Sequence, residues 1–194
     1  SLLDIDFGSY PFVTSSSTMV AGACTGLGVS PSKIGDVFGI FKAYCTRVGS
    51  GPFPTELHDA TGEAMRKEGN EFGSTTGRPR RCGWIDLPAL KYSIMINGVT
   101  QLFMMKADVL NIFEEIKICT HYELPDGSKV DRLTYELNDD EVKPVYKTVP
   151  GWFTSLAEVN EYEKFPKELR NYVDLLEKEL GVPIKMVSVG PDRK

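Results

Sequence analysis

A loop at residues 74–80 has the most evident capacity for chemistry. It reads Ser74-Thr75-Thr76-Gly77-Arg78-Pro79-Arg80 and combines hydroxyl groups, a glycine and two guanidinium groups. Arginine pairs with a carboxylate or a phosphate through two parallel hydrogen bonds, and hydroxyl and backbone N–H groups can complete the shell around such an anion. A solvated basic loop with a tight turn explains the same composition. The loop therefore indicates a small-anion site as one of two interpretations.

A second group, Lys106-Ala107-Asp108, follows the apolar run at residues 102–105. A carboxylate at this place can accept hydrogen bonds from N1–H and from the exocyclic amine of guanine, whereas adenine offers no such pair of donors. The lysine stem can lie over the flat base. A further tight loop, Ser188-Val189-Gly190, can offer backbone groups to a base. Each motif is short, so a surface ion pair and a plain turn remain the alternative interpretations.

Several signatures of complete catalytic sites are missing. The sequence contains no GxxxxGK[ST] phosphate loop, no GxGxxG and no GxSxG. His58 and His121 stand apart from any metal-binding pattern, and each is better explained as an ordinary surface or strand residue. Binding motifs without a catalytic centre indicate part of an active site.

The elements that must position these motifs alternate between helix and strand. A helix at 166–180 is the clearest, because apolar residues recur at helical spacing between Pro166 and Gly181. Asp86 predicts the start of another helix that reaches about residue 97. We further expect helices at 18–26 and 60–69, a buried strand in the second half of 37–48, strands at 102–105, 115–123, 142–149 and 182–187, and loops at 51–55 and 70–83. This pattern predicts an α/β fold, with a partial, mixed and mostly parallel sheet flanked by helices.

Composition narrows the classes of partner and compartment. The 194 residues carry a net charge of −5 and a pI near 5.2, which argues against a nucleic-acid surface. The cluster Arg78, Arg80 and Arg81 therefore indicates a small anionic ligand. No apolar run is long enough to span a bilayer, and the first residues lack the features of a signal peptide. The four cysteines lie far apart, so we expect reduced thiols in a cytoplasmic protein.

A set of longer phrases resembles the adenylosuccinate synthetase family in order and spacing along essentially all 194 residues. The phrases are Leu3-Asp4-Ile5-Asp6, Tyr10-Pro11-Phe12-Val13-Thr14-Ser15-Ser16, Lys42-Ala43-Tyr44 with Thr46-Arg47-Val48-Gly49, Gly51-Pro52-Phe53-Pro54-Thr55-Glu56-Leu57, Gly77-Arg78-Pro79-Arg80-Arg81 with Gly83-Trp84, Pro150-Gly151-Trp152 and Gly190-Pro191-Asp192-Arg193. The resemblance implies that residues 1–194 are the carboxy-terminal portion of a larger single-domain enzyme.

The resemblance also implies roles for individual positions in binding inosine monophosphate (IMP) and L-aspartate. Thr14 resembles the threonine that helps to hold the 5′-phosphate of IMP, and Val48 would offer backbone contacts to its ribose. Ser74 to Arg80 resembles the mobile loop that closes over L-aspartate. Within that loop, Thr76, Arg78 and Arg80 would meet the carboxylates of aspartate. Arg78 would also touch IMP.

For GTP, the resemblance implies that Lys106, Ala107 and Asp108 read the guanine base. Ser188, Val189 and Gly190 would close the other side of that base, and Arg80 would approach the nucleotide. Ala107 replaces a commonly larger residue of the family. Ser17-Thr18-Met19 stands where the family often has Asn-Thr-Thr, so the shape of that loop departs from the family pattern.

In the family, GTP phosphorylates the 6-oxygen of IMP, and the amine of aspartate then displaces phosphate to give adenylosuccinate. The aspartate base, the histidine acid and the ligands of Mg²⁺ lie in the amino-terminal half, so we assign no catalytic or metal-binding residue to this chain. The family implies a homodimeric ligase of purine nucleotide biosynthesis. We expect the chain alone to be inactive.

Two alternatives remain from the sequence. One is a stand-alone guanine-nucleotide-binding module without catalysis. The other is a structural fragment whose pockets do not form and whose uncovered sheet edges and apolar faces cause self-association.

Overall fold

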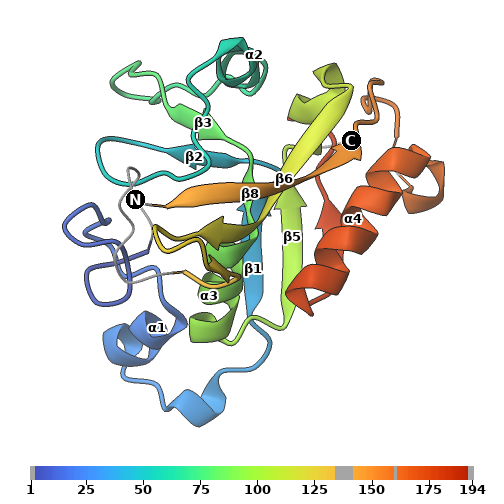
Figure 1. Cartoon of the computed structure of the whole chain (residues 1–194). Helices are drawn as coiled ribbons and strands as arrows, with labels where there is room; N and C mark the ends of the chain where they lie inside the picture. The colour runs from blue at the N-terminus through green and yellow to red at the C-terminus, as the bar shows by residue number, and fades with distance from the viewer. Residues whose placement is uncertain (1–2, 134–141, 160, 192–194) are drawn as a thin grey trace.

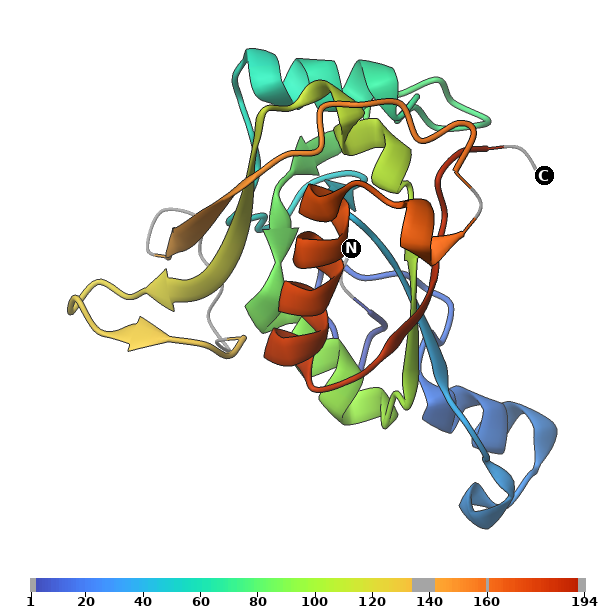
Figure 2. The ribbon, with the colours of Figure 1, turned by 90° about the vertical axis from the view of Figure 1, so that its right-hand side faces the viewer.

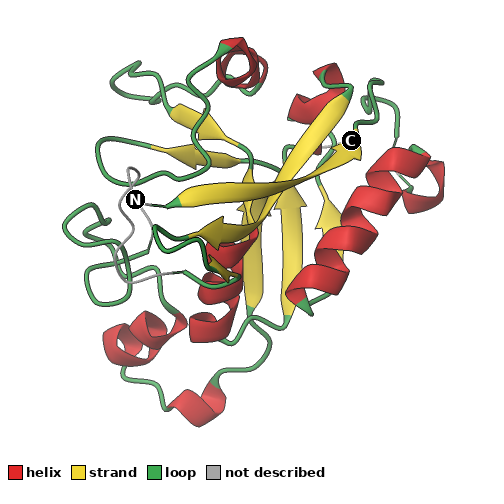
Figure 3. Cartoon of the chain, viewed as in Figure 1, coloured by secondary structure: helices red, strands yellow, loops and turns green. Residues whose placement is uncertain are grey.

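The structure, a computed structural model, describes residues 3–133, 142–159 and 161–191 of the 194-residue chain. Strands gather at the centre and helices surround them, as Figures 1 and 3 show. The helices are α1 (Val20–Leu27), α2 (Ala60–Glu68), α3 (Leu87–Asn97) and α4 (Lys167–Leu180), with short 3₁₀ turns η1 (Pro31–Lys33), η2 (Ala107–Ile112) and η3 (Tyr162–Lys164). The α/β class predicted from the sequence is confirmed.

The central sheet is parallel and has the strand order β1-β5-β9. Its strands are β1 (Phe38–Lys42), β5 (Gln101–Met105) and β9 (Ile184–Val187). Lys42 pairs with Met105, and Met104 pairs with Val187, so the carboxyl ends of all three strands meet at one edge. In parallel α/β sheets this edge is where ligands bind.

Two further groups of strands flank this sheet. A mixed sheet contains β4 (Ile85–Asp86), which runs parallel to β6 (Glu115–Glu123), and β7 (Lys129–Val130) and β8 (Lys143–Pro150), which both run antiparallel to β6. The pair β2 (Cys45–Arg47) and β3 (Arg81–Gly83) is antiparallel. The antiparallel pairs of the described chain therefore lie outside the β1-β5-β9 sheet.

Helix α4 covers the central strands, as the turned view of Figure 2 shows. Its apolar face is buried in the core, and Gly181 ends the helix in the left-handed conformation with φ of 68°. Tyr172 of this face donates a hydrogen bond of 2.8 Å to the carbonyl of Ala43, directly after β1. The helix predicted at 166–180 is confirmed, and it supports the carboxyl edge of the sheet.

The other predicted elements match with small shifts at their ends, and four strands of the described chain were not predicted: β1, β3, β4 and β7. The first half of 37–48 forms β1, and the predicted strand in its second half is β2. The predicted loop at 70–83 ends earlier than expected, because Arg81–Gly83 forms β3 against β2. Strands β1, β3 and β4 pair with strands distant in sequence, which a local pattern does not reveal. All four cysteines are free thiols, as predicted.

Strand β1 keeps an apolar surface in this chain. Phe38 is 51% exposed and Ile40 is 72% exposed. A groove of about 360 Å³ lies beside them, lined by residues of β1, of α3 and of the segment before α1. Self-association of the chain alone remains a prediction. No helix among the described residues is both long and apolar enough to span a membrane.

Helix α3 begins at a buried carboxylate. Asp86 accepts a hydrogen bond of 3.1 Å from the backbone N–H of Ala89, which confirms the predicted cap. The hydroxyl of Tyr122 lies 2.7 Å from both of its oxygens. Burial raises the pKa of Asp86 to about 6, and these hydrogen bonds offset only part of that effect.

This carboxylate predicts a pH dependence of stability. The folded state binds the proton of Asp86 more tightly than the unfolded state does, so its contribution to the free energy of unfolding falls as the pH rises from about 4 to about 6. The expected loss is roughly 3 kcal/mol. Asp86→Asn keeps the capping oxygen but cannot titrate. Denaturant titrations from pH 4 to pH 7 should therefore show the free energy of unfolding of the variant rising relative to that of the wild type. A constant difference across this range would contradict the assignment.

Candidate functional site

The carboxyl edge of the β1-β5-β9 sheet brings separate parts of the sequence together. Lys106-Ala107-Asp108 directly follows β5, and Ser188-Val189-Gly190 directly follows β9. The backbone N–H of Ala107 donates to the carbonyl of Ser188 over 3.0 Å, and that of Ser188 donates to the carbonyl of Met104 over 2.8 Å. The two segments predicted to enclose a base are therefore neighbours.

Lys106 turns the chain at this edge. Its backbone lies in the left-handed region with φ of 61°, which is uncommon for a residue other than glycine. The turn begins η2 and places Asp108 in the first turn of that element. An unfavourable backbone conformation at a strand end, beside polar groups, is typical of a functional position.

Asp108 carries a partly desolvated carboxylate. Its side chain is half-buried, and burial raises the pKa of its carboxyl, with a hydrogen bond from its own backbone N–H and the charge of Lys106 acting in the opposite direction. Within the part of the chain that the structure describes, no other side chain donates a hydrogen bond to this carboxylate. A partly desolvated carboxylate without a side-chain donor suits a ligand that supplies N–H groups.

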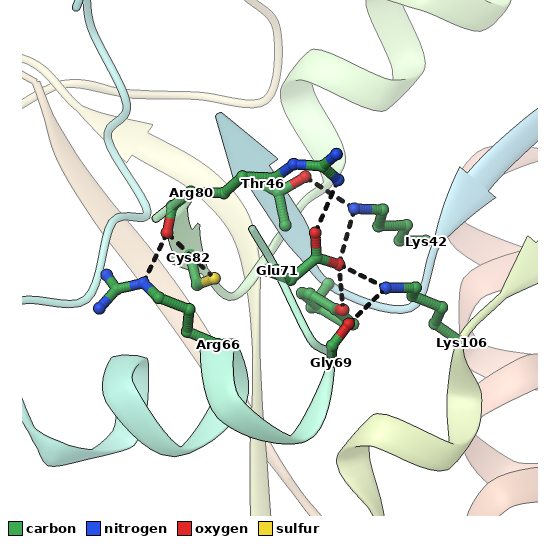
Figure 4. Close-up of polar contacts among 9 residues, drawn as sticks. Lys42, Thr46, Arg66, Gly69, Glu71, Arg80, Cys82 and Lys106 are labelled. Carbon is green, nitrogen blue, oxygen red and sulfur yellow. Dashed lines mark hydrogen bonds and ion pairs between the residues drawn. The ribbon is translucent and has the colours of Figure 1, made fainter. Parts of the chain in front are cut away.

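A cluster of charges around Glu71 lies next to these segments (Figure 4). The Glu71 side chain is fully buried. Its Oε1 accepts from Lys42 Nζ over 2.8 Å, from the Tyr44 hydroxyl over 2.6 Å and from Lys106 Nζ over 2.8 Å. Its Oε2 accepts from Arg80 Nη1 over 2.9 Å. One carboxylate therefore joins the end of β1, the turn after β5 and the end of the arginine loop.

The cations determine the charge of Glu71. Burial alone would raise the pKa of its carboxyl, but hydrogen bonds from Lys106, Lys42 and Tyr44 lower it to about 2. Burial lowers the pKa of Lys42, against the attraction of Glu71. The cluster is therefore an ion-pair network with one buried anion shared by several cations.

Arg80 is fixed at both its backbone and its side chain. Arg66 of α2 donates from Nε to the carbonyl of Arg80 over 2.7 Å, and Lys106 Nζ holds the carbonyl of Gly69 at 2.7 Å (Figure 4). Nε of Arg80 is buried and has no hydrogen-bond partner among the described residues. Arg80 therefore has a preset direction.

The rest of the arginine loop is a closed but exposed turn. Its base is joined by backbone hydrogen bonds from Gly73 to the carbonyl of Arg78 over 2.9 Å and from Arg80 to that of Glu71 over 2.9 Å. Gly77 has φ of 63°, a conformation that a side chain would disfavour. The side chains from Ser74 to Pro79 are exposed. The base of the loop is anchored, whereas its hydroxyls and Arg78 face solvent.

The residues predicted for IMP are brought together only in part. Buried Arg47 donates to the carbonyl of Phe12 over 3.0 Å and to that of Ser50 over 3.1 Å, which joins the segment before Thr14 to the segment around Val48. Val48 itself is 63% exposed. No hydrogen bond or ion pair between side chains of the described residues joins Arg78 to Thr14 or Val48.

Sequence reasoning missed the most connected residue of the site. Glu71 follows Gly69 and Asn70 in a polar loop, where a solvated carboxylate is the ordinary expectation. Lys42 and Tyr44 entered the sequence analysis only as part of a family phrase. The available signal was the position of Glu71 in a loop that also carries Arg80.

The model of the family described as adenylosuccinate synthetase matches residues 1–194, the whole chain. This chain belongs to the adenylosuccinate synthetase family. The resemblance drawn from the sequence phrases is confirmed, and so is the assignment to a ligase family of purine biosynthesis.

Similar proteins agree with the family match. The chain is 68% identical to the adenylosuccinate synthetase of Cytophaga hutchinsonii and 62% identical to that of Bacteroides fragilis, and the match covers 100% of this chain and 45% of each of those proteins. The solved structure of fully ligated adenylosuccinate synthetase from Plasmodium falciparum has a TM-score of 0.95 and 42% identity, covering 100% of this chain and 46% of that one. The chain thus corresponds to somewhat less than half of an adenylosuccinate synthetase.

Proposed function

We propose that the complete protein containing this chain joins L-aspartate to IMP in a reaction driven by GTP, giving adenylosuccinate, GDP and phosphate. This chain is the carboxy-terminal portion and supplies the guanine pocket and the aspartate loop. The observation that carries the proposal is the gathering of Lys106, Asp108 and Ser188 at the carboxyl edge of the parallel sheet, with Arg80 linked to the same edge through Glu71.

In the guanine pocket, Asp108 accepts from N1–H and from the exocyclic amine of the base. The stem of Lys106 and the backbone of Ala107 line one side. The backbone of Ser188, Val189 and Gly190 closes the other side, which the hydrogen bonds of Ser188 with Met104 and Ala107 support. A carboxylate that accepts from both donors discriminates strongly between guanine and adenine, because bound adenine would leave the buried carboxylate without hydrogen-bond partners.

In the aspartate loop, the hydroxyls of Ser74, Thr75 and Thr76 and the guanidinium groups of Arg78 and Arg80 bind the carboxylates of L-aspartate. Gly77 and Pro79 shape the turn. Thr14 binds the phosphate of IMP, Val48 contacts its ribose through the backbone, and Arg78 reaches it from the loop. Because the base of the loop is anchored and its tip is exposed, closure over the substrate needs only the tip to move.

The general base, the general acid and the ligands of Mg²⁺ belong to the part of the enzyme outside this chain. In the reaction Mg²⁺ neutralises charge on the phosphates of GTP. Among the described residues no three His, Cys, Asp or Glu side chains form a metal-ligating group. We further propose a cytoplasmic homodimer as the working state.

The proposal is tested by turnover. The complete protein, given IMP, L-aspartate, GTP and Mg²⁺, should form adenylosuccinate, and the isolated chain should form none. Omission of any one of these substrates should abolish the product. Tight GDP binding by the isolated chain without turnover in the complete protein would instead favour a guanine-nucleotide-binding module. Lack of product from the complete protein would overturn the proposed reaction.

A further inference from the structure

The two oxygens of Glu71 face different parts of the candidate site. Oε1 accepts from Lys106, at the start of the predicted guanine pocket, and Oε2 accepts from Arg80, at the end of the predicted aspartate loop. Both distances, 2.8 Å and 2.9 Å, are those of charge-assisted hydrogen bonds. A carboxylate is planar and rigid, so the positions of these two cations are fixed relative to each other.

The surroundings of Glu71 keep it in one orientation. Its side chain has no exposed surface, and the hydroxyl of Tyr44 and the ammonium of Lys42 hold Oε1 from a third direction. Lys42 also donates to Thr46 of β2 over 2.9 Å. A displacement of Lys106 therefore cannot be absorbed by a free rotation of Glu71, and it is transmitted to the guanidinium of Arg80.

Glu71 contacts more cations than an ion pair with a purely structural role requires. A stabilising pair needs one cation, whereas Glu71 joins two cations that come from separate loops, each placed by its own backbone. Lys106 adopts a left-handed backbone, and Arg80 is held at its carbonyl by Arg66.

We propose that Glu71 is a positioning residue that couples occupancy of the guanine pocket to the arrangement of the aspartate loop. The inference rests on the proposed function and adds to it a link between two substrates. Guanine nucleotide contacting Lys106 and Asp108 fixes the Lys106 ammonium against Oε1. The carboxylate then holds Arg80 in the direction needed for L-aspartate. By reciprocity, aspartate bound at Arg80 strengthens nucleotide binding by the same factor.

The test asks whether a change in the guanine pocket alters the affinity for aspartate. In the complete protein, Lys106→Met removes the ammonium at Oε1 while keeping a flexible apolar stem. We expect the KM for L-aspartate to rise at least about fivefold at saturating GTP, although Lys106 lies in the nucleotide pocket. In a Glu71→Gln background, the same Lys106→Met change should alter that KM by less than about twofold, because the link is already broken.

Matched variants separate coupling from loss of charge or loss of folding. Glu63→Gln removes the same charge from an exposed carboxylate that pairs with Arg66 on α2, and it should leave both KM values within about twofold. Thermal unfolding of each variant shows whether it is folded. If Glu71→Gln does not fold, the coupling is measured with Glu71 intact, by comparing Lys106→Met, Arg80→Lys and the double variant with the wild type. Non-additive changes in the KM for L-aspartate would then support the link.

Two results would overturn the inference. One is a Lys106→Met enzyme whose GTP KM rises while its aspartate KM stays within about twofold of the wild type. The other is additivity of Lys106→Met and Arg80→Lys. A wild-type protein without any turnover would count against the proposed function instead. In that case the same cycle, run on the dissociation constants of GDP and L-aspartate by calorimetry, would still measure the coupling.

Discussion

An Asp108→Asn variant should exchange a preference for guanine nucleotides for a preference for xanthine nucleotides. The carboxylate of Asp108 offers two acceptors to the two donors on the guanine edge. Asparagine offers one acceptor and one donor, which matches the N1–H and the 2-oxo group of xanthine. Loss of one charged hydrogen bond and the pairing of two donors against each other should weaken GDP binding by about 2–3 kcal/mol, roughly 100-fold.

Ligand-observed NMR with GDP, ADP and XDP measures this exchange on the chain or on the complete protein. Wild type should prefer GDP, and the variant should prefer XDP, with ADP bound weakly by both. Asp126→Asn is the matched control, because Asp126 lies in an exposed turn where it accepts from Ser128. An unchanged GDP preference in Asp108→Asn would show that this carboxylate does not read the base.

Local sequence signals predicted the parts of the fold that depend on nearby residues. The apolar period of α4, the cap at Asp86 and the strand before Lys106 all lie within one element or at its end. The position of Lys106-Ala107-Asp108 at the carboxyl edge follows from the same logic, because a polar group after a buried parallel strand must lie at that edge. The sequence therefore predicted where Lys106-Ala107-Asp108 lies without any knowledge of tertiary contacts.

The parts that the sequence did not predict depend on distant partners. Strand β3 forms because Arg81–Gly83 meets Cys45–Arg47 across a long connection. Glu71 is buried only because three separate segments converge on it, which carry Lys42 with Tyr44, Arg80, and Lys106. Apart from its place in a loop that also carries Arg80, Glu71 has no local mark of such burial, so its contacts are seen only in the structure.

The two buried carboxylates show how partners decide the sign of a pKa shift. Asp86 and Glu71 are both removed from water, but Asp86 meets a neutral tyrosine and a backbone N–H, whereas Glu71 meets three cations. Burial accordingly raises the pKa of Asp86 to about 6, and at Glu71 the cations outweigh burial and lower the pKa to about 2. Loss of negative charge should therefore be tolerated at Asp86 and damaging at Glu71.

A Glu71→Ala variant should be among the most destabilised single variants of this chain. The substitution leaves the Tyr44 hydroxyl buried without its acceptor and removes the shared anion of Lys42, Lys106 and Arg80. Breaking a buried ion pair costs about 3–5 kcal/mol, but the cations here are 26–36% exposed and regain some hydration. We therefore expect a loss of about 2–4 kcal/mol in the free energy of unfolding at neutral pH.

The pH dependence of that loss identifies its cause. Because the folded pKa of Glu71 is depressed, its stabilisation is fully present above the ordinary value of 4.5 and is lost as the pH falls toward 2. Denaturant titrations at pH 7, 4.5 and 3 should show the gap between wild type and Glu71→Ala narrowing at the lowest pH. Glu63→Ala, which removes an exposed ion pair on α2, should cost less than about 1 kcal/mol throughout. A gap that stays constant down to pH 3 would assign the loss to packing, and the shared anion would then not be what stabilises this edge of the sheet.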